Sequence, residues 1–368
     1  MRRALGGSPA GLNARVGYPN LVLVDSPPEQ RAETAPAPPT RRAVRVLGLF
    51  VSVVLLLLVA LASIAIGAKS LPLGDVWHGL FHDTGTYADI VVDDRISRTV
   101  LGLLAGAALG LSGAVLQALT RNPLADPGLL GINAGASAAV VTAITYFGVT
   151  SLSGYVWFAF AGAAVVGALV WFLGGSRGAT PVRLALAGTA ISAALYGYLQ
   201  AVMIMDDAAL SKMRFWTVGS LASATGSTIT QVAPFLAVGT VVSLLLARPL
   251  NAVAMGDDTA RALGANLNRT RALAMLSATV LCGAATAACG PIVFVGLMVP
   301  HVVRSFTGPD LRWILPYATI LSPALLLGAD VFGRLIARPA ELQVGIVTAV
   351  LGGPVFIFLV RRRRTAQL

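Results

Sequence analysis

Long apolar runs with very few charged residues constrain the fold of this chain more than any other feature. The first begins near Val46 and ends near Gly67, which is long enough to cross the roughly 30 Å hydrocarbon core of a bilayer. Similar runs recur along the chain, and charged residues make up only 12% of the sequence, about half the share in a soluble domain. We therefore predict an all-α polytopic membrane protein, in which 39 glycines favour close helix packing in lipid.

Charge places the start of the second span. An arginine at mid-membrane costs about 2.5–3.5 kcal/mol on insertion scales. Arg95 and Arg98 are therefore predicted at the outer mouth, with the span starting after Arg98. A polar loop is expected before it, with Asp75, Asp83, Asp89, Asp93 and Asp94. Further spans are predicted near Ile132–Val149, Tyr155–Leu173, Leu184–Met205, Thr230–Leu246, Leu315–Phe332 and Val344–Val360.

The segment Thr270–Val303 is either one long span or a hairpin broken at Gly290-Pro291. A hairpin places the arginines that follow it in the cytoplasm, as the positive-inside rule favours, whereas a single span places them outside. We therefore predict the hairpin, about ten spans in total and both termini in the cytoplasm. The net charge of +11 then reflects topology rather than nucleic-acid binding. The arginines concerned are Arg304, Arg312 and Arg361–Arg364 after the hairpin, with Arg41, Arg42 and Arg45 before the first span.

The chain divides into a tail and one membrane domain. Residues 1–45 are Pro-rich, with almost no apolar periodicity, and are predicted to be a disordered cytoplasmic tail. The first apolar run starts too far along the chain to be a signal peptide. Residues 46–364 are predicted to form the transmembrane domain, and residues 365–368 a short cytoplasmic tail.

A polar island, Leu250–Arg271, separates two apolar runs. Its middle favours a short helix, which Asp257 can N-cap and Gly264 can close. A helix this short is unstable alone in water, so it is predicted to dock on something. Two interpretations follow from the residues: an ordinary loop between spans, or a contact helix that receives force from a soluble partner.

A weak internal repeat is present. The block Gly106–Gly113 resembles Gly283–Gly290, and at the same offset Leu104 matches Leu281, Pro123 matches Pro300 and Gly131 matches Gly308. Five spans separate the two copies, so they are predicted to point in opposite directions. This is the inverted repeat common in transporters, although small residues also recur by chance in membrane helices.

The chain lacks the motifs of an ATPase or an enzyme. A phosphate-binding loop needs Gly-Lys-Ser/Thr, but Lys69 follows Ala68 and Lys212 follows Ser211. If ATP drives this protein, another polypeptide binds it, and we expect no cofactor and no catalytic residues here. A carboxylate within the spans would favour an ion-coupled carrier. The main candidate is Asp330, which also has the i,i+4 spacing for an ion pair with Arg334.

The histidines and cysteines do not predict a metal site. His78 and His82 have i,i+4 spacing, which permits a metal ion, but packing of an amphipathic helix on the membrane surface is favoured. His301 follows Pro300 and is predicted to cap or pack a helix end. Cys282 and Cys289 share a helix face without being able to form a disulfide within it, and are predicted to be packing residues.

Two stretches of the sequence are specific enough to indicate a family. The first is RISRTVLGLLAGAALGLSGAVLQALTRNPLADPGLLGINAGA at Arg95–Ala136. The second is GPIVFVGLMVPHVVRSFTGPDLRWILP at Gly290–Pro316, followed by ADVFGR and ELQVGIVTAVLGGPVFIFLVRR. Both resemble the FecCD-type family of ABC-importer permeases for iron-siderophores, haem and vitamin B12, and the match extends over roughly residues 46–364. Ser97 and Gln343, both expected at the outer mouth, stand where the family usually has proline.

The resemblance implies a type II ABC importer permease fold of ten helices with an inverted repeat, paired with a second permease copy or paralogue in the bilayer. It also implies two ATP-binding cassette subunits and an extracytoplasmic substrate-binding protein as partners. The family's coupling helix would be AMGDDTARALG, and its outer arginines would dock the binding protein. The residues implied are Asp257, Asp258, Ala260, Arg261, Leu263 and Gly264 for coupling, Arg95, Arg98 and Arg334 for docking, and Asn122, Pro123, Pro127, Gly290, Pro291, Pro300 and His301 in structural motifs.

The resemblance predicts a permease subunit that imports a ferric siderophore across the bacterial cytoplasmic membrane. The iron would travel inside its chelate, so no metal ligands are required in this chain. Haem or cobalamin are the alternative cargoes within the family. A secondary carrier without an ATPase, or a structural or receptor-like membrane protein, are alternatives outside it.

Overall fold

The computed structural model describes residues 41–81, 85–175 and 181–365. The predicted tail up to residue 40, Asp83 and His82 lie outside the described residues. The described part is helical throughout its regular structure. Its helices are α1 (Arg41–Ala65), α2 (Leu73–Phe81), α3 (Tyr87–Thr120), η1 (Pro127–Leu130), α4 (Ile132–Phe147), α5 (Leu152–Gly175), α6 (Pro181–Met205), α7 (Asp207–Trp216), α8 (Gly226–Leu245), α9 (Ala247–Ala254), α10 (Asp257–Ala262), α11 (Leu267–Cys289), α12 (Val295–Thr307), α13 (Leu311–Ile336) and α14 (Val344–Thr365).

The predicted spans correspond to ten of these helices. Seven, namely α1, α3, α5, α6, α8, α11 and α13, are long and apolar enough to cross a membrane, and α4 and the apolar part of α14 are shorter. The tenth, α12, has 13 residues and forms the second arm of the predicted hairpin. The break lies between the end of α11 at Cys289 and the start of α12 at Val295, which confirms that Thr270–Val303 is not one span.

The helix that carries the second span begins earlier in the chain than the predicted span. The helix α3 begins at Tyr87, before Arg95 and Arg98, so most of the expected acidic loop is helical. A capping box explains this start: the Thr86 hydroxyl accepts from the Asp89 N–H at 3.4 Å, and the Asp89 carboxylate accepts from the Thr86 N–H at 2.9 Å. Both early amides are thereby satisfied, which favours helix despite the charges.

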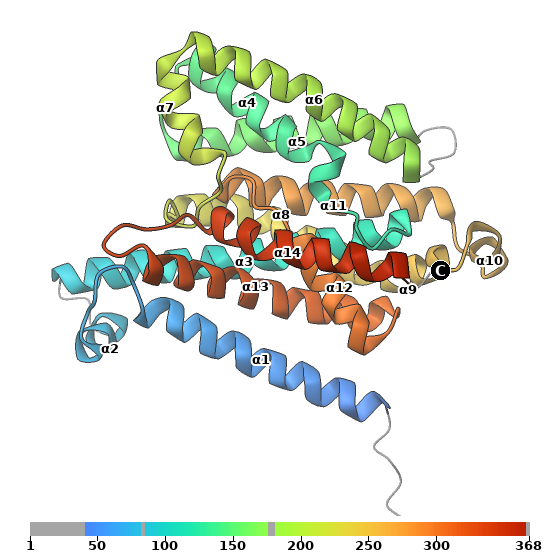
Figure 1. Cartoon of the computed structure of the whole chain (residues 1–368), viewed down its shortest axis with the longest axis horizontal. Helices are drawn as coiled ribbons and strands as arrows, with labels where there is room; N and C mark the ends of the chain where they lie inside the picture. The colour runs from blue at the N-terminus through green and yellow to red at the C-terminus, as the bar shows by residue number, and fades with distance from the viewer. Residues whose placement is uncertain (1–40, 82–84, 176–180, 366–368) are drawn as a thin grey trace, which may run out of the picture. The chain divides into compact units, whose positions relative to one another are not determined.

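Two opposite ends can be recognised in the bundle (Figure 1). At the α10 end lie α9, α10 and the starts of α1 and α13, where the Tyr317 hydroxyl donates to the Arg45 carbonyl at 2.6 Å. At the α2 end lie α2, α7 and the loop before α14. The chain's α1 begins, and α14 ends, on the same side as α10 (Figure 1).

The helices α3, α11 and α13 form the buried centre of the bundle, whereas α1 and α6 are mostly exposed. Small residues allow the central helices to approach closely. A Cβ on Gly296 of α12 would lie only 2.6 Å from the Leu109 carbonyl oxygen of α3. Beside this contact, Gln117 donates to the Leu297 carbonyl at 3.0 Å. Glycine at such positions permits backbone contact between membrane helices.

The helices α3 and α11 run in opposite directions. The end of α3 and the start of α11 lie together, since Arg121 and Arg271 both contact Asp257. The blocks Gly106–Gly113 and Gly283–Gly290 therefore lie on antiparallel helices, as the predicted inverted repeat requires.

Candidate functional site

The polar island folds into α9, α10 and the first turns of α11. Glycine bounds α10 at both ends: Gly256 has φ +118° and Gly264 has φ +77°, a left-handed backbone that favours glycine. The Gly264 N–H donates to the Arg261 carbonyl at 2.9 Å. Gly264 therefore closes the helix as predicted. The predicted N-cap was wrong: Gly256 occupies that position, and Asp257 is the first helical residue.

A small apolar cluster of its own holds α10 in place. Ala260 is fully buried against Val253 of α9 and Leu267 of α11, with Ala252 completing the cluster. Ala260 therefore faces its own chain and stabilises the position of α10. Leu263, by contrast, is 63% exposed. An exposed leucine at the end of a short docked helix is available for contact with another protein.

Asp257 ties α10 to the ends of two central helices. Its carboxylate forms an ion pair with Arg121, the residue that follows α3, and accepts from Arg271 of α11 at 2.8 and 2.9 Å. Arg121 also donates to the Val253 carbonyl of α9 at 2.9 Å. Burial opposes the charge, but the guanidinium hydrogen bonds from Arg121 and Arg271 hold the pKa of Asp257 below its ordinary value. These contacts connect α10 to α3, α9 and α11.

The remaining charged residues of α10 form a local pair. Arg261 donates to Asp258 at 2.8 Å with i,i+3 spacing, and both side chains are well exposed. Exposed pairs of this kind stabilise little, about 0.2–1 kcal/mol. Asp258 and Arg261 are therefore open to rearrangement when a partner binds.

The Asn122–Pro127 motif turns the chain after α3. Arg121 adopts a left-handed backbone at φ 50°, and the Asn122 side chain accepts from the Leu124 N–H at 3.0 Å. Asp126 then caps η1 by accepting from the Gly128 N–H at 2.8 Å. Burial raises the pKa of Asp126 to about 6 in spite of that hydrogen bond. This turn presents the Arg121 side chain to Asp257.

The second motif, Gly290–His301, approaches the first in space. Pro127, the first residue of η1, lies near α12: a Cβ on Gly296 would be 3.5 Å from its Cδ. Pro300 is buried within α12, and His301 is partly exposed. Pro123 lines a shallow cavity with Arg304 beside the start of α13. The two motifs thus shape the packing of α3, η1 and α12.

The break at Gly290 fixes the α2 end of the hairpin. Gly290 has φ +73°, and a Cβ there would collide with the Trp216 carbonyl. The Cys289 carbonyl accepts from the Ser220 N–H at 2.8 Å, and the Pro291 carbonyl lies against Gly219. Gly290 and Pro291 therefore hold the loop after α7 against the end of α11.

The three predicted docking arginines form a buried network at the α2 end. Arg98 donates to both Asp330 carboxylate oxygens at 2.7–3.2 Å and to Glu341 at 2.6 Å. Arg334 pairs with Asp330 at 3.1 Å and donates to the Ser63 carbonyl at 3.0 Å. Arg95 donates to carbonyls at the end of α1 and at Lys69, at 2.6–3.1 Å. The network ties α1, α3 and α13 together.

The three predicted docking arginines are therefore buried in this structure. Arg95, Arg98 and Arg334 are only 6%, 8% and 1% exposed. The reason is that long guanidinium side chains reach inward to carbonyls and to Asp330, which is fully buried. The basic residues exposed nearby are Lys69 and Arg338. The docking role itself stays a prediction.

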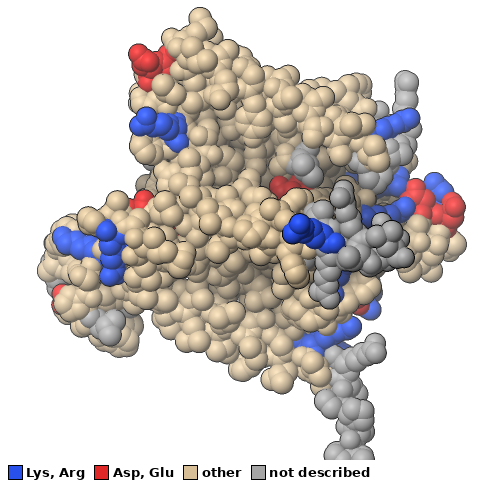
Figure 2. Space-filling model, viewed as in Figure 1, with Lys and Arg blue, Asp and Glu red and all other residues tan. Residues whose placement is uncertain are grey.

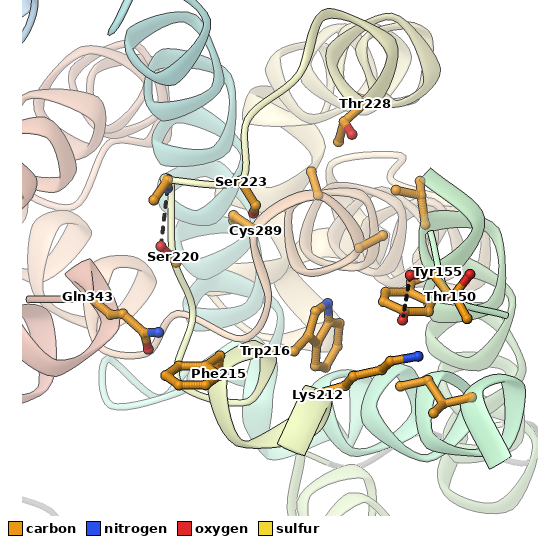
Figure 3. Close-up of a pocket in the computed structure, with 15 residues that line it drawn as sticks. Thr150, Tyr155, Lys212, Phe215, Trp216, Ser220, Ser223, Thr228, Cys289 and Gln343 are labelled. Atoms are coloured by element: carbon orange, nitrogen blue, oxygen red, sulfur yellow. Dashed lines mark hydrogen bonds between the residues drawn. The ribbon is translucent and has the colours of Figure 1, made fainter. Parts of the chain in front are cut away.

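A cavity of about 460 Å³ opens at the α2 end (Figure 3). Lys212 and Trp216 of α7 and Tyr155 of α5 line it, with Ser220 and Gln343 from two loops. The Lys212 amine points into the cavity toward Tyr155, whose hydroxyl donates to the Thr150 carbonyl at 3.1 Å (Figure 3). The cavity combines aromatic, hydroxyl and cationic groups, which suits a polar ligand.

Several residues of these sites were not found by sequence reasoning. Arg121 and Glu341 were missed because their partners lie far away along the chain. Arg271 lies only 14 residues from Asp257, but the turn between α10 and α11 decides their contact. A buried polar contact was also missed, in which the Thr286 hydroxyl donates to the Asn133 side chain at 2.9 Å. Cys282 and Cys289 are free and buried, in agreement with a packing role.

Comparison with known proteins places these features in one family. The model of the FecCD transport family matches residues 55–362. The ferric enterobactin transport system permease protein FepD of Escherichia coli is 48% identical over 88% of this chain and 96% of its own length. The hemin transport system permease protein HmuU of Yersinia pestis is 38% identical over 84% and 94%.

Structural comparison agrees with the sequence comparison. A solved metal-chelate type ABC transporter in an inward-facing conformation superposes with a TM-score of 0.75 and 27% identity, covering 86% of this chain and 99% of its own. This chain belongs to the FecCD transport family.

Proposed function

We propose that this chain is the membrane permease of an ATP-driven importer and that its cargo is a ferric siderophore similar to ferric enterobactin. The observation that carries the proposal is the 48% identity to the ferric enterobactin permease, which extends over 96% of that protein. Identity to the hemin permease is lower, at 38%. Haem, or cobalamin, is therefore the second choice of cargo.

The contacts at the α10 end support an ATPase subunit as a partner. Docking of a soluble subunit on α10 would contact the exposed Leu263 and the Asp258–Arg261 pair. Asp257 would pass the displacement to α3 and α11 through Arg121 and Arg271. We place this end in the cytoplasm, where ATP is available, together with both termini of the membrane domain. The permease itself carries out no bond chemistry in this proposal.

The α2 end would then face the substrate-binding protein and receive the cargo. Lys69 and Arg338 offer exposed positive charge there, which would steer an acidic partner. To reach Arg98, a partner carboxylate would have to displace Glu341, whose side chain is 38% exposed. The cavity beside Lys212 would lie next to the entrance. A second permease copy or paralogue would complete the pathway across the bilayer.

Uptake measurements test the cargo. The permease, its ATPase and its binding protein are to be expressed in a bacterial strain that lacks its own siderophore permeases, and radioactive iron uptake is to be measured. Ferric enterobactin should be taken up fastest among ferric enterobactin, ferric citrate, a ferric hydroxamate and hemin. An ATPase variant that cannot hydrolyse ATP serves as the control and should give no uptake. Faster uptake of hemin than of ferric enterobactin would overturn the proposed cargo.

A further inference from the structure

A groove of about 860 Å³ lies at the α10 end, between the last turn of α8, α9 and the first turns of α11. Its walls come from the residues on either side of the polar island. One rim reaches the coupling segment at Leu263 and Gly264. The groove is separate from the cavity at the α2 end, and the transport mechanism proposed above uses only its rim at Leu263.

One part of the groove is apolar and continues along the spanning helices. Val242 and Leu245 of α8 line it on one side, and Leu273 of α11 on the other. Leu245 is 74% exposed, and the outward face of α8 continues with the exposed Val241 and Val238. A helix that crosses a membrane presents such a face to acyl chains. The apolar part of the groove therefore opens toward lipid.

The other part of the groove is basic. Arg248 and Arg269 line it and are exposed, and within the described residues neither guanidinium group has a hydrogen bond or an ion pair. Arg312 also lines the groove but is already paired with Asp310, to which it donates at 2.9–3.1 Å. The groove has no carboxylate among the described residues that line it. Two unneutralised guanidinium groups thus stand at the polar end of an apolar groove.

We propose that this groove binds an anionic phospholipid. The phosphate would lie between Arg248 and Arg269, and the acyl chains would follow Val242, Leu245 and Leu273. Basic pockets beside spanning helices recognise anionic headgroups through charge, and each arginine near the surface adds to the attraction. A free phosphate would use the arginines alone and a soluble subunit would not reach the apolar wall, so lipid fits the whole groove. The inference rests on membrane insertion and does not depend on which cargo is transported.

Lipid binding in this groove would also affect coupling. The headgroup would touch the segment that carries Leu263 and Gly264, and Arg269 is two residues from Arg271, which holds Asp257. A bound lipid would therefore stabilise the end of α10, where the ATPase subunit is proposed to act on the permease.

Lipid titration of the purified complex tests the site. The permease with its ATPase is to be delipidated in detergent and titrated with phosphatidylglycerol or phosphatidylethanolamine of identical chains, with bound lipid counted by native mass spectrometry. The double variant Arg248→Gln with Arg269→Gln should bind phosphatidylglycerol about 30-fold more weakly, since two basic contacts are lost. Binding of phosphatidylethanolamine should not change. Arg42→Gln, which removes an exposed arginine at the same end, is the matched control and should bind as the unchanged protein does.

A second variant separates lipid from other anionic ligands. Leu245→Gln should also weaken phosphatidylglycerol binding, because it removes an acyl-chain contact and leaves both arginines in place. Displacement of phosphatidylglycerol by millimolar inorganic phosphate would mean a free phosphate site and would overturn the proposal. Unchanged lipid binding by the double variant would also overturn the proposal. This holds as well if that variant loses its ATPase subunit while its lipid binding stays unchanged. Failure of enterobactin uptake would not affect these results.

Discussion

At the scale of single residues, Asp330 is the side chain on which most other groups at the α2 end depend. It is fully buried and pairs with both Arg98 and Arg334. Asp330→Asn would leave the buried Arg334 without its counter-charge and Arg98 with Glu341 as its remaining carboxylate partner. Breaking a buried pair in this way typically costs about 3–5 kcal/mol. We therefore expect a clear loss of thermal stability, measured as the unfolding midpoint of the purified permease in detergent.

Glu341→Gln is the matched control for this prediction. Glu341 accepts from the same Arg98 side chain at 2.6 Å, but from a half-exposed position. Its removal should cost at most about 1 kcal/mol, as for other exposed pairs. Equal losses in the two variants would show that Asp330 has no special role in neutralising the network.

Residue-level predictions from sequence succeeded for neighbours and failed for distant partners. The i,i+4 pair of Asp330 with Arg334 was predicted, because helical spacing alone brings these side chains together. The pairing of Arg98 with Asp330 was not, because 232 residues separate them and only packing of α3 on α13 joins them. The same limitation hid the contact of Asp257 with Arg121, which lies 136 residues away along the chain.

At the scale of elements, we expect α10 to be the part of the chain that contacts an ATPase subunit. Leu263 is exposed at its end, so Leu263→Asp should place a charge in the contact and leave the fold intact. We expect this variant to lose siderophore uptake and to lose co-purification with the ATPase. Leu263→Met keeps an apolar side chain of similar volume and should retain both activities. Normal uptake and co-purification of Leu263→Asp would rule out the contact role.

Helices were predicted best from the sequence where the bilayer constrains them. Positive charge distinguished a hairpin from a single span at Gly290, since only the hairpin obeys the positive-inside rule. The short helix α2 was predicted from the i,i+4 spacing around His78, whereas α7 and α9 were missed, because eight to ten residues near a membrane surface give little periodicity. The end of α10 was predicted from Gly264, whereas its start was misplaced by one residue because Gly256 replaces the usual polar cap.

At the scale of the whole membrane domain, charge is concentrated at the α2 and α10 ends. On the face shown in Figure 2, Lys, Arg, Asp and Glu lie mainly at these two ends, with a broad belt of other residues between them. Hydropathy predicted this belt, because the bilayer imposes length and composition on the helices that cross it. It did not predict which helices form the centre, since that depends on contacts between small residues such as Gly113 and Gly296.

The last prediction concerns the orientation of the domain in the membrane. We expect the α10 end to face the cytoplasm. The native thiols of Cys282 and Cys289 are buried, so labelling of a new cysteine can be read without replacing them. In spheroplasts with an intact cytoplasmic membrane, a membrane-impermeant maleimide should label Ser70→Cys at the α2 end and should not label Ala262→Cys on α10. Permeabilisation should make Ala262→Cys reactive, since Ala262 is exposed. Labelling of Ala262→Cys before permeabilisation would invert the orientation and with it the assignment of the ATPase to this end.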